Sequence, residues 1–267
     1  MKMTFCVRRC FVLLSWWCVA LLVAGGGAIA ARAQSTNGAA DVSQFPDLKQ
    51  LPGKVPPHVW SGLAGVWARD HAKWKATASN EAGAVVFLGD SITEEWSTLA
   101  RDFPQLKVAN RGIGGDITSG VLYRLKADVL SLDPAAIVLL IGTNDVGDGA
   151  DADDVAGNIR LILQAIHNFN PKLKVIVCKI LPRTDGNAPA YAVKIKKTNA
   201  LIERVVKKEP GVTLCDTWSA FTDKDGHQVA ADFRLDHLHL NAAGYGVWKS
   251  ALEPVMANLH LASGRAE

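Results

Sequence analysis

The sequence contains little cysteine, and most of it lies near the N-terminus. Of the five cysteines in 267 residues, three lie within the first 18 positions, and only Cys178 and Cys215 lie further along the chain. No Cys-x-x-Cys pair and no zinc-ligand spacing occurs, so the sequence predicts no cysteine-ligated zinc site. Cys178 and Cys215 each lie at the end of an apolar run. We therefore expect two buried free thiols, and a disulfide between them is the open alternative.

The chain also has little net charge once its first 33 residues are set aside. The full sequence carries a formal charge of +3, but residues 1–33 hold four basic side chains and no acidic one, so the remainder carries 3 − 4 = −1. A strongly basic surface, typical of proteins that bind nucleic acid or anionic membranes, is therefore not expected. The sequence has no internal repeat or low-complexity segment, which excludes repeat architectures.

Residues 1–33 have the pattern of a secretory signal peptide. A basic start precedes an apolar stretch over residues 11–30, and "ARAQ" offers a small-residue cleavage site after Ala33. The pattern predicts a secreted or periplasmic protein with no stable membrane insertion after cleavage. An uncleaved N-terminal anchor is the alternative, because the apolar stretch is nearly long enough to span a bilayer.

The rest of the chain is long enough for one sizeable core. Residues 34–55 are polar and then interrupted by prolines, so we interpret them as a linker, and residues 56–267 as one domain. Helical periodicity predicts a first helix over 57–79, with an apolar stripe formed by Trp60, Leu63, Trp67 and Trp74. We expect this stripe to pack the helix onto the domain; stacking on sugar rings is the alternative function of exposed tryptophans.

Short apolar runs alternate with helical segments through the domain. The runs predict five strands, at residues 84–88, 106–110, 135–142, 174–181 and 212–216. Unbroken apolar strands separated by helices indicate an α/β fold with a parallel sheet covered on both faces, and the most apolar run, 135–142, is the expected central strand. Ligand sites of such sheets lie beyond the carboxyl ends of the strands.

Polar motifs follow each predicted strand, and two of them supply a candidate nucleophile and base. Ser91 lies in "GDS" directly after the first strand, and "DHLH" holds Asp236 and His239 three residues apart. A serine hydroxyl needs a base to take its proton, and a carboxylate can fix the tautomer of that base. The alternative is structural, since Ser91 or Asp90 could cap the next helix.

An acyl-transfer site also needs N–H donors for the oxyanion that develops during attack. Three candidates lie after the first three strands: the backbone N–H of Ser91, the backbone N–H of Gly115 in "RGIGGD", and the side-chain amide of Asn144 in "GTND". A tight turn at the glycines and an Asx-turn at Asn144 are the structural alternatives.

Four segments of this sequence resemble the signature blocks of the SGNH, or GDSL, hydrolase family. They are "FLGDSIT", "NRGIGGDIT", "IGTNDV" and "DHLHLNAAGYGVW", in family order, within residues 85–248. The nearest resemblance is to the branch of the platelet-activating-factor acetylhydrolase catalytic subunits. It implies Ser91 as nucleophile, His239 as base, Asp236 as its partner, and Ser91, Gly115 and Asn144 as the oxyanion hole. It also implies a flavodoxin-like three-layer αβα sandwich with five parallel strands, and no metal or organic cofactor.

The expected function is that of a secreted serine esterase that acts on short-chain acyl esters, such as acetylated carbohydrates, through an acyl-enzyme. The expected partner is a small-molecule or glycan ester, and the oligomeric state stays open. One alternative is a lysophospholipase, or a hydrolase of short-chain lipid esters or thioesters, that uses the same site. Another is a non-catalytic carbohydrate-binding protein.

A metal-dependent phosphoesterase is a further alternative. Its ligands would come from Asp90, Asp116, Asn144, Asp145, Asp236, His237 and His239. Trp96, Arg111 and Arg183 also lie beside the motifs and could shape a pocket, with structural packing as the alternative for each.

Overall fold

A computed structural model describes residues 47–261 of this chain. The described residues all belong to one compact unit, Gly38–Glu267. The predicted signal peptide, its cleavage site and most of the predicted linker lie outside the described residues. Within residues 47–261, none of the helices has the length and hydrophobicity needed to cross a membrane.

The centre of the fold is a five-stranded sheet whose neighbouring strands all run parallel, as the sequence predicted. The strands are β1 (Val85–Gly89), β2 (Val108–Gly112), β3 (Ala136–Leu140), β4 (Lys174–Cys178) and β5 (Val212–Cys215). Their order, β2-β1-β3-β4-β5, is the flavodoxin-like order and makes β3 the central strand. The chain winds in one direction from β1 to β2 and in the other from β3 to β5, so a switch point lies between β1 and β3.

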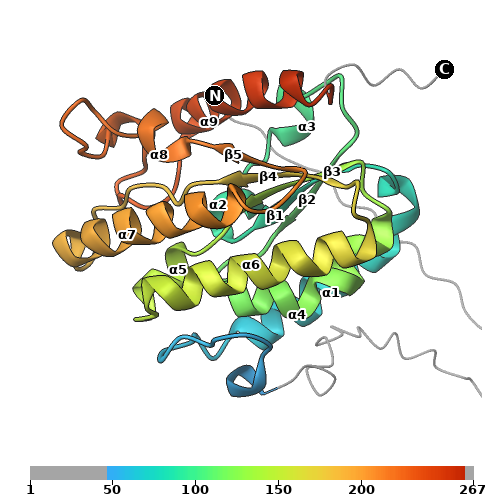
Figure 1. The fold of residues 1–267 in the computed structure, drawn as a ribbon, viewed down its shortest axis with the longest axis horizontal. Helices are drawn as coiled ribbons and strands as arrows, with labels where there is room; N and C mark the ends of the chain where they lie inside the picture. Colours follow the sequence, from blue (N-terminus) through green and yellow to red (C-terminus); the bar gives the residue numbers. More distant parts are fainter. Residues whose placement is uncertain (1–46, 262–267) are drawn as a thin grey trace, which may run out of the picture. The chain divides into compact units, whose positions relative to one another are not determined.

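Helices cover both faces of the sheet (Figure 1). The longer ones are α1 (Leu63–Glu81), α4 (Thr118–Asp128), α6 (Ala152–Phe169), α7 (Ala188–Val206) and α9 (Ala242–Asn258). The short ones are α2 (Ser91–Glu94), α3 (Leu99–Asp102), α5 (Thr143–Gly147) and α8 (Thr217–Ala220). Helices α4, α6 and α7 pack on one face, and α2, α3 and α9 on the other. The result is the expected three-layer αβα sandwich.

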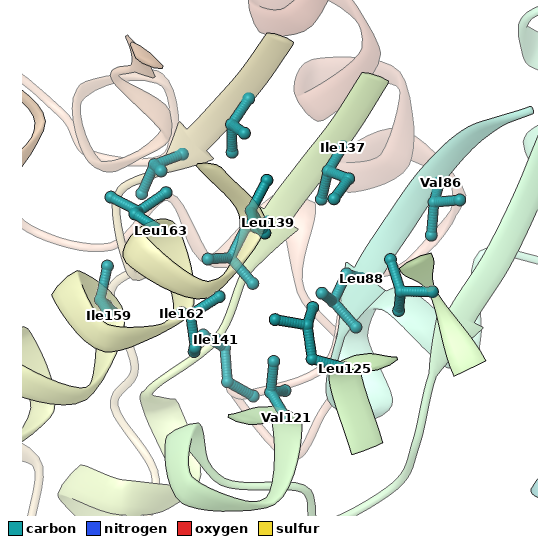
Figure 2. Packing of buried hydrophobic residues seen from close by; sticks show 14 of the residues in the cluster. Val86, Leu88, Val121, Leu125, Ile137, Leu139, Ile141, Ile159, Ile162 and Leu163 are labelled. Atoms are coloured by element: carbon teal, nitrogen blue, oxygen red, sulfur yellow. The ribbon is translucent and has the colours of Figure 1, made fainter. Parts of the chain in front are cut away.

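The two faces are built from alternate residues of each strand, because successive side chains of a strand point to opposite sides. On β1, Val86 and Leu88 join the cluster under α4 and α6, while Val85 and Phe87 join the cluster under α9. Figure 2 shows the first cluster, where strand residues such as Leu139 meet helix residues such as Ile162. Each such buried side chain contributes about 2 kcal/mol of hydrophobic stabilisation.

The first helix is shorter than predicted, and this changes the position of one tryptophan. Helix α1 begins at Leu63 rather than near residue 57, because the chain first makes a turn in which Leu63 N–H donates to the carbonyl of Trp60 (3.1 Å). Trp67 and Trp74 are buried as expected, but Trp60 precedes the helix and 53% of its surface is exposed. The prediction that Trp60 belongs to the packed stripe is therefore wrong.

The described end of the predicted linker packs against the domain. Leu51 is buried beside Trp67. The backbone of Lys54 forms two hydrogen bonds with the side chain of Asn158 in α6: Lys54 N–H donates to Oδ1 (2.8 Å), and Nδ2 donates to Lys54 O (2.7 Å). Residues 51–55 are therefore held on the sandwich rather than serving as a free connection.

The helix predicted after Ser91 is broken into α2 and α3. Trp96 lies between them, and its ring packs into the core against Tyr245 and Trp248 of α9. The helical segment is interrupted between Glu94 and Leu99, and the indole of Trp96 is buried at this interruption. Trp96 is therefore a core residue, and it does not line the site as one interpretation of the sequence proposed.

Candidate active site

Ser91 lies where β1 passes into α2, at the carboxyl edge of the sheet. The turn requires Gly89, because a Cβ at that position would overlap the backbone oxygen of Leu140 and the Thr93 hydroxyl. Asp90 is the N-cap of α2, and its Oδ1 accepts the N–H of Ile92 at 3.0 Å. The cap predicted for Ser91 or Asp90 is thus Asp90, and the Ser91 hydroxyl is left for another partner.

That partner is His239. The Oγ of Ser91 lies 2.8 Å from Nε2 of His239, and Nδ1 of His239 lies 2.8 Å from Oδ2 of Asp236. The three residues therefore form one continuous hydrogen-bonded row, although 148 positions separate the serine from the histidine. The serine and the imidazole are half-buried, so the row lies open to solvent at the rim of the sandwich.

The carboxylate of Asp236 is held in its ionised form. Partial burial opposes ionisation, but N–H donors from the backbone of His239 and Leu238 and from the His239 ring outweigh it, and the pKa of Asp236 falls to about 2. An ionised Oδ2 can only accept a hydrogen bond, so Nδ1 carries the ring proton and donates it to Asp236, which leaves Nε2 as an acceptor facing the serine. This is the tautomer a general base requires.

The loop that carries Asp236 and His239 is fastened at several points. The N–H of Arg234 donates to His239 O (2.8 Å), and the carbonyl of His237 accepts the N–H of Thr184 (3.2 Å). An ion pair of 2.6 Å joins Arg234 to Glu95, which directly follows α2. Sequence reasoning missed this pair, because nothing in the local pattern connects two residues so far apart.

The three predicted oxyanion donors follow the neighbouring strands β1, β2 and β3. Ser91, Gly115 and Asn144 are all half-buried, so each is accessible at the rim. Asn144 Nδ2 donates to the carbonyl of Asp116 (2.9 Å), which ties α5 to the loop after β2. An amide nitrogen carries a second N–H, which is the donor an oxyanion hole needs. Gly115 has φ +77°, a conformation that favours glycine.

Three buried carboxylates lie around this edge, and each accepts at least one hydrogen bond from the protein, although Oδ2 of Asp90 is buried with no partner among the described residues. Asp116 pairs with Arg124 at 2.7 Å, and Asp145 accepts from the Thr118 hydroxyl at 2.5 Å. Burial raises the pKa of Asp116, and it raises the pKa of Asp90 and of Asp145 to about 7. The hydrogen bonds that each carboxylate accepts lower its pKa, but burial outweighs them. These acids orient helices and loops and do not form an open cation site.

The metal-dependent alternative is not supported by this arrangement. Among residues 47–261, the group of three possible ligands whose atoms lie within 4.8 Å of one another is Asp223, Asp225 and His227, all exposed. The seven residues named for a two-metal site do not assemble into such a group. Asp236, one of the seven, instead holds His239.

The two arginines considered beside the site have different surroundings. Arg111 is buried and donates to Glu81 and to the carbonyl of Asp128 (2.9 Å), so it packs the sheet edge against α1. Arg183 donates to the carbonyl of Thr143 (2.9 Å), next to Asn144. Arg183 therefore braces the start of α5, which carries a predicted oxyanion donor, whereas the contacts of Arg111 are structural.

Cys178 and Cys215 are buried free thiols, as expected. They occupy paired positions on β4 and β5. Burial is the main cause that raises the pKa of Cys178 well above its ordinary value, and the contact with Cys215 adds to it. This thiol therefore stays protonated.

Known proteins share this fold and sequence pattern. The sequence profile of the GDSL-like lipase/acylhydrolase family matches residues 87–247. The platelet-activating factor acetylhydrolase IB subunit alpha2 of Homo sapiens is 34% identical over 198 residues, which cover 71% of this chain and 83% of the relative. Subunit alpha1 of Bos taurus is 31% identical over 202 residues, which cover 73% and 84%.

Solved structures give the same result for the fold. A structure from Streptococcus pneumonia matches with a TM-score of 0.66 and 25% identity, and covers 73% of this chain and 94% of its own. A GDSL-like lipase from Bacteroides thetaiotaomicron matches with a TM-score of 0.63 and 24% identity, over 71% and 98%. The class that this fold and these relatives define is that of the carboxylic ester hydrolases. Within that class, the chain belongs to the GDSL-like lipase/acylhydrolase family.

Proposed function

We propose that this chain is an exported serine esterase that cleaves short-chain acyl esters, acetylated carbohydrates first among them, through a covalent acyl-enzyme. The observation that carries the proposal is the hydrogen-bonded row of Ser91, His239 and Asp236, with 2.8 Å at each step. Export is proposed from the signal-peptide pattern of residues 1–33.

In the proposed first step, the Ser91 oxygen attacks the ester carbonyl carbon while His239 Nε2 takes the hydroxyl proton. The carbonyl oxygen becomes an oxyanion that accepts hydrogen bonds from the N–H of Ser91, the N–H of Gly115 and the Asn144 amide. His239 then gives its proton to the leaving alcohol as the C–O bond breaks, and Ser91 stays acylated.

The second step repeats these roles with water. His239 takes a proton from the water that attacks the acyl-enzyme, the acid leaves, and the Ser91 hydroxyl is restored. Asp236 stabilises the imidazolium in both steps, because its pKa of about 2 keeps it ionised throughout the neutral range. No step needs a metal or an organic cofactor.

A short acyl group is proposed because the relatives of this chain are named as acetylhydrolases. The same name favours a second candidate, an acetyl ester of a lipid. The alcohol therefore distinguishes the two candidates, and both use the same serine.

The test is a panel of esters followed by acid release in a pH-stat, with full-length protein and Ser91→Ala side by side. Acyl length is varied on one alcohol, and the alcohol is varied on acetate. The proposal expects kcat/KM to fall as the acyl chain grows beyond about four carbons, and expects acetylated sugars to exceed acetylated lipids. Equal rates in wild type and Ser91→Ala on every ester would overturn the serine mechanism.

A further inference from the structure

We propose that Trp60 is the platform on which the sugar ring of the ester substrate stacks, at the edge of the oxyanion hole. This inference rests on the proposed function and assigns its alcohol side to a residue outside the matched family segment, residues 87–247. It starts from an unusual feature of the fold. Trp60 is one of the large apolar side chains of the described residues that stay exposed, and its indole lies against Gly115 of the site.

Trp60 lies against the predicted oxyanion glycine. A Cβ added to Gly115 would stand 3.0 Å from Cε3 and 3.5 Å from Cζ3 of the Trp60 ring. The indole thus packs directly on the backbone whose N–H is to face the substrate oxygen. An ester bound with its carbonyl oxygen at Gly115 would have another part of the molecule within reach of the ring.

A second glycine, Gly62, leaves the space that the indole of Trp60 occupies. A Cβ on Gly62 would overlap Cζ2 of Trp60, so the ring can lie over this residue only because no side chain is present. The backbone of Gly62 has φ −74° and ψ −11°, which any residue adopts. The backbone conformation therefore does not require glycine here. Glycine is required because the Trp60 ring needs the space that a side chain would fill.

The segment that carries Trp60 is fastened to the sandwich at both ends. Lys54 is held by the double hydrogen bond to Asn158, a side chain only 1% exposed. The N–H of His58 donates to the carbonyl of Asp148, just beyond α5 (3.2 Å). The turn into α1 then closes with Leu63 N–H on the carbonyl of Trp60 (3.1 Å). These contacts hold an exposed apolar ring in place without burying it.

The half-exposed state of the ring indicates the chemistry of its ligand. Covering an indole face removes apolar surface from water and is favourable. A pyranose ring presents C–H groups on one face and keeps its hydroxyls in water on the other, so it suits a platform that is covered on one side only. An alkyl chain on the same platform would leave its outer surface in water. An acetyl group is too small to cover the ring, so the alcohol is the part assigned to Trp60.

The experiment compares Trp60→Ala, Trp60→Phe and wild type on three acetates: an acetylated methyl xylopyranoside, hexyl acetate and ethyl acetate. Acid release gives KM and kcat for each. The inference expects Trp60→Ala to lower kcat/KM about tenfold on the sugar ester, mainly through KM, and less than twofold on ethyl acetate. Trp60→Phe should recover most of the loss, because it keeps an aromatic face.

A second pair of variants tests the position of the ring without removing it. Gly62→Ala inserts a methyl group where the indole lies, so it should reproduce the sugar-specific rise in KM with Trp60 still present. Gly65→Ala is the matched control, because Gly65 lies three residues further on, in the first turn of α1, and a Cβ there meets nothing within 4 Å. Circular dichroism and thermal unfolding establish that each variant is folded.

Three results would overturn the inference. An equal loss on all three acetates would mean that Trp60 only positions Gly115. A larger loss on hexyl acetate would assign the ring to alkyl chains, and no loss on any substrate would leave the platform without a role. The proposed function is judged separately, because turnover of ethyl acetate by wild type and its loss in Ser91→Ala do not depend on Trp60.

Discussion

Ser91→Ala is expected to lower kcat on a short acyl ester by about 10⁴-fold or more, with KM changed little. The Oγ of Ser91 is the atom 2.8 Å from the base, and the alanine variant leaves Nε2 of His239 with no hydroxyl to deprotonate. The measurement is steady-state acid release, with long incubations to quantify the residual rate. The midpoint of thermal unfolding should stay close to that of wild type, because the removed oxygen is only half-buried and caps no helix.

The matched control is Ser97→Ala, which makes the same chemical change at an exposed serine six residues further on. Ser97→Ala should retain wild-type kcat within about twofold. If Ser91→Ala kept more than a tenth of the wild-type rate, Ser91 would not be the nucleophile, and the acyl-enzyme pathway would have to be abandoned.

Asp236→Asn is expected to lower kcat by about 10³- to 10⁴-fold, although the side chain keeps its shape. An asparagine oxygen can still accept the backbone N–H of Leu238 and His239, so its NH₂ group faces the imidazole. That group donates a hydrogen bond to Nδ1, so the ring proton lies on Nε2. A general base needs Nε2 without a proton. The hydroxyl of Ser91 then has no acceptor for its proton.

Steady-state rates on ethyl acetate measure this effect, and Asp225→Asn serves as the control. Asp225 lies in an exposed turn, and its carboxylate pairs only with the exposed Lys224 among the described residues. A kcat for Asp236→Asn within threefold of wild type would show that the carboxylate does not set the tautomer of His239, and a different base or partner would be required.

The sheet and the proposed site row were predictable because their signals are local. Each strand is an unbroken apolar run, and the motifs after the runs necessarily converge at one edge of a parallel sheet. The spacing of Asp236 and His239 placed both on one turn of backbone. Strand ends were less predictable: the apolar run of β4 continues to Leu181, which is buried beyond the last ladder residue, Cys178.

The surroundings of the site were not predictable, since they depend on contacts between distant residues. Lys54 and Asn158, 104 positions apart, fix the segment that presents Trp60. The periodicity holds for Leu63, Trp67 and Trp74, but a turn from Trp60 to Leu63 precedes the helix, so Trp60 does not share its face. The exposure of a side chain depends on tertiary packing, and the pattern of a single sequence does not predict that packing.

The most direct test of the central claim is to find the atom that becomes covalently bonded. Wild-type protein is treated with a fluorophosphonate, which phosphonylates serine hydroxyls activated by a neighbouring base, and tryptic peptides are then mapped by mass. The account predicts one adduct, on Ser91 within the peptide 76–101, and none in Ser91→Ala. An adduct on another residue, or ester hydrolysis that continues after Ser91 is fully phosphonylated, would contradict it.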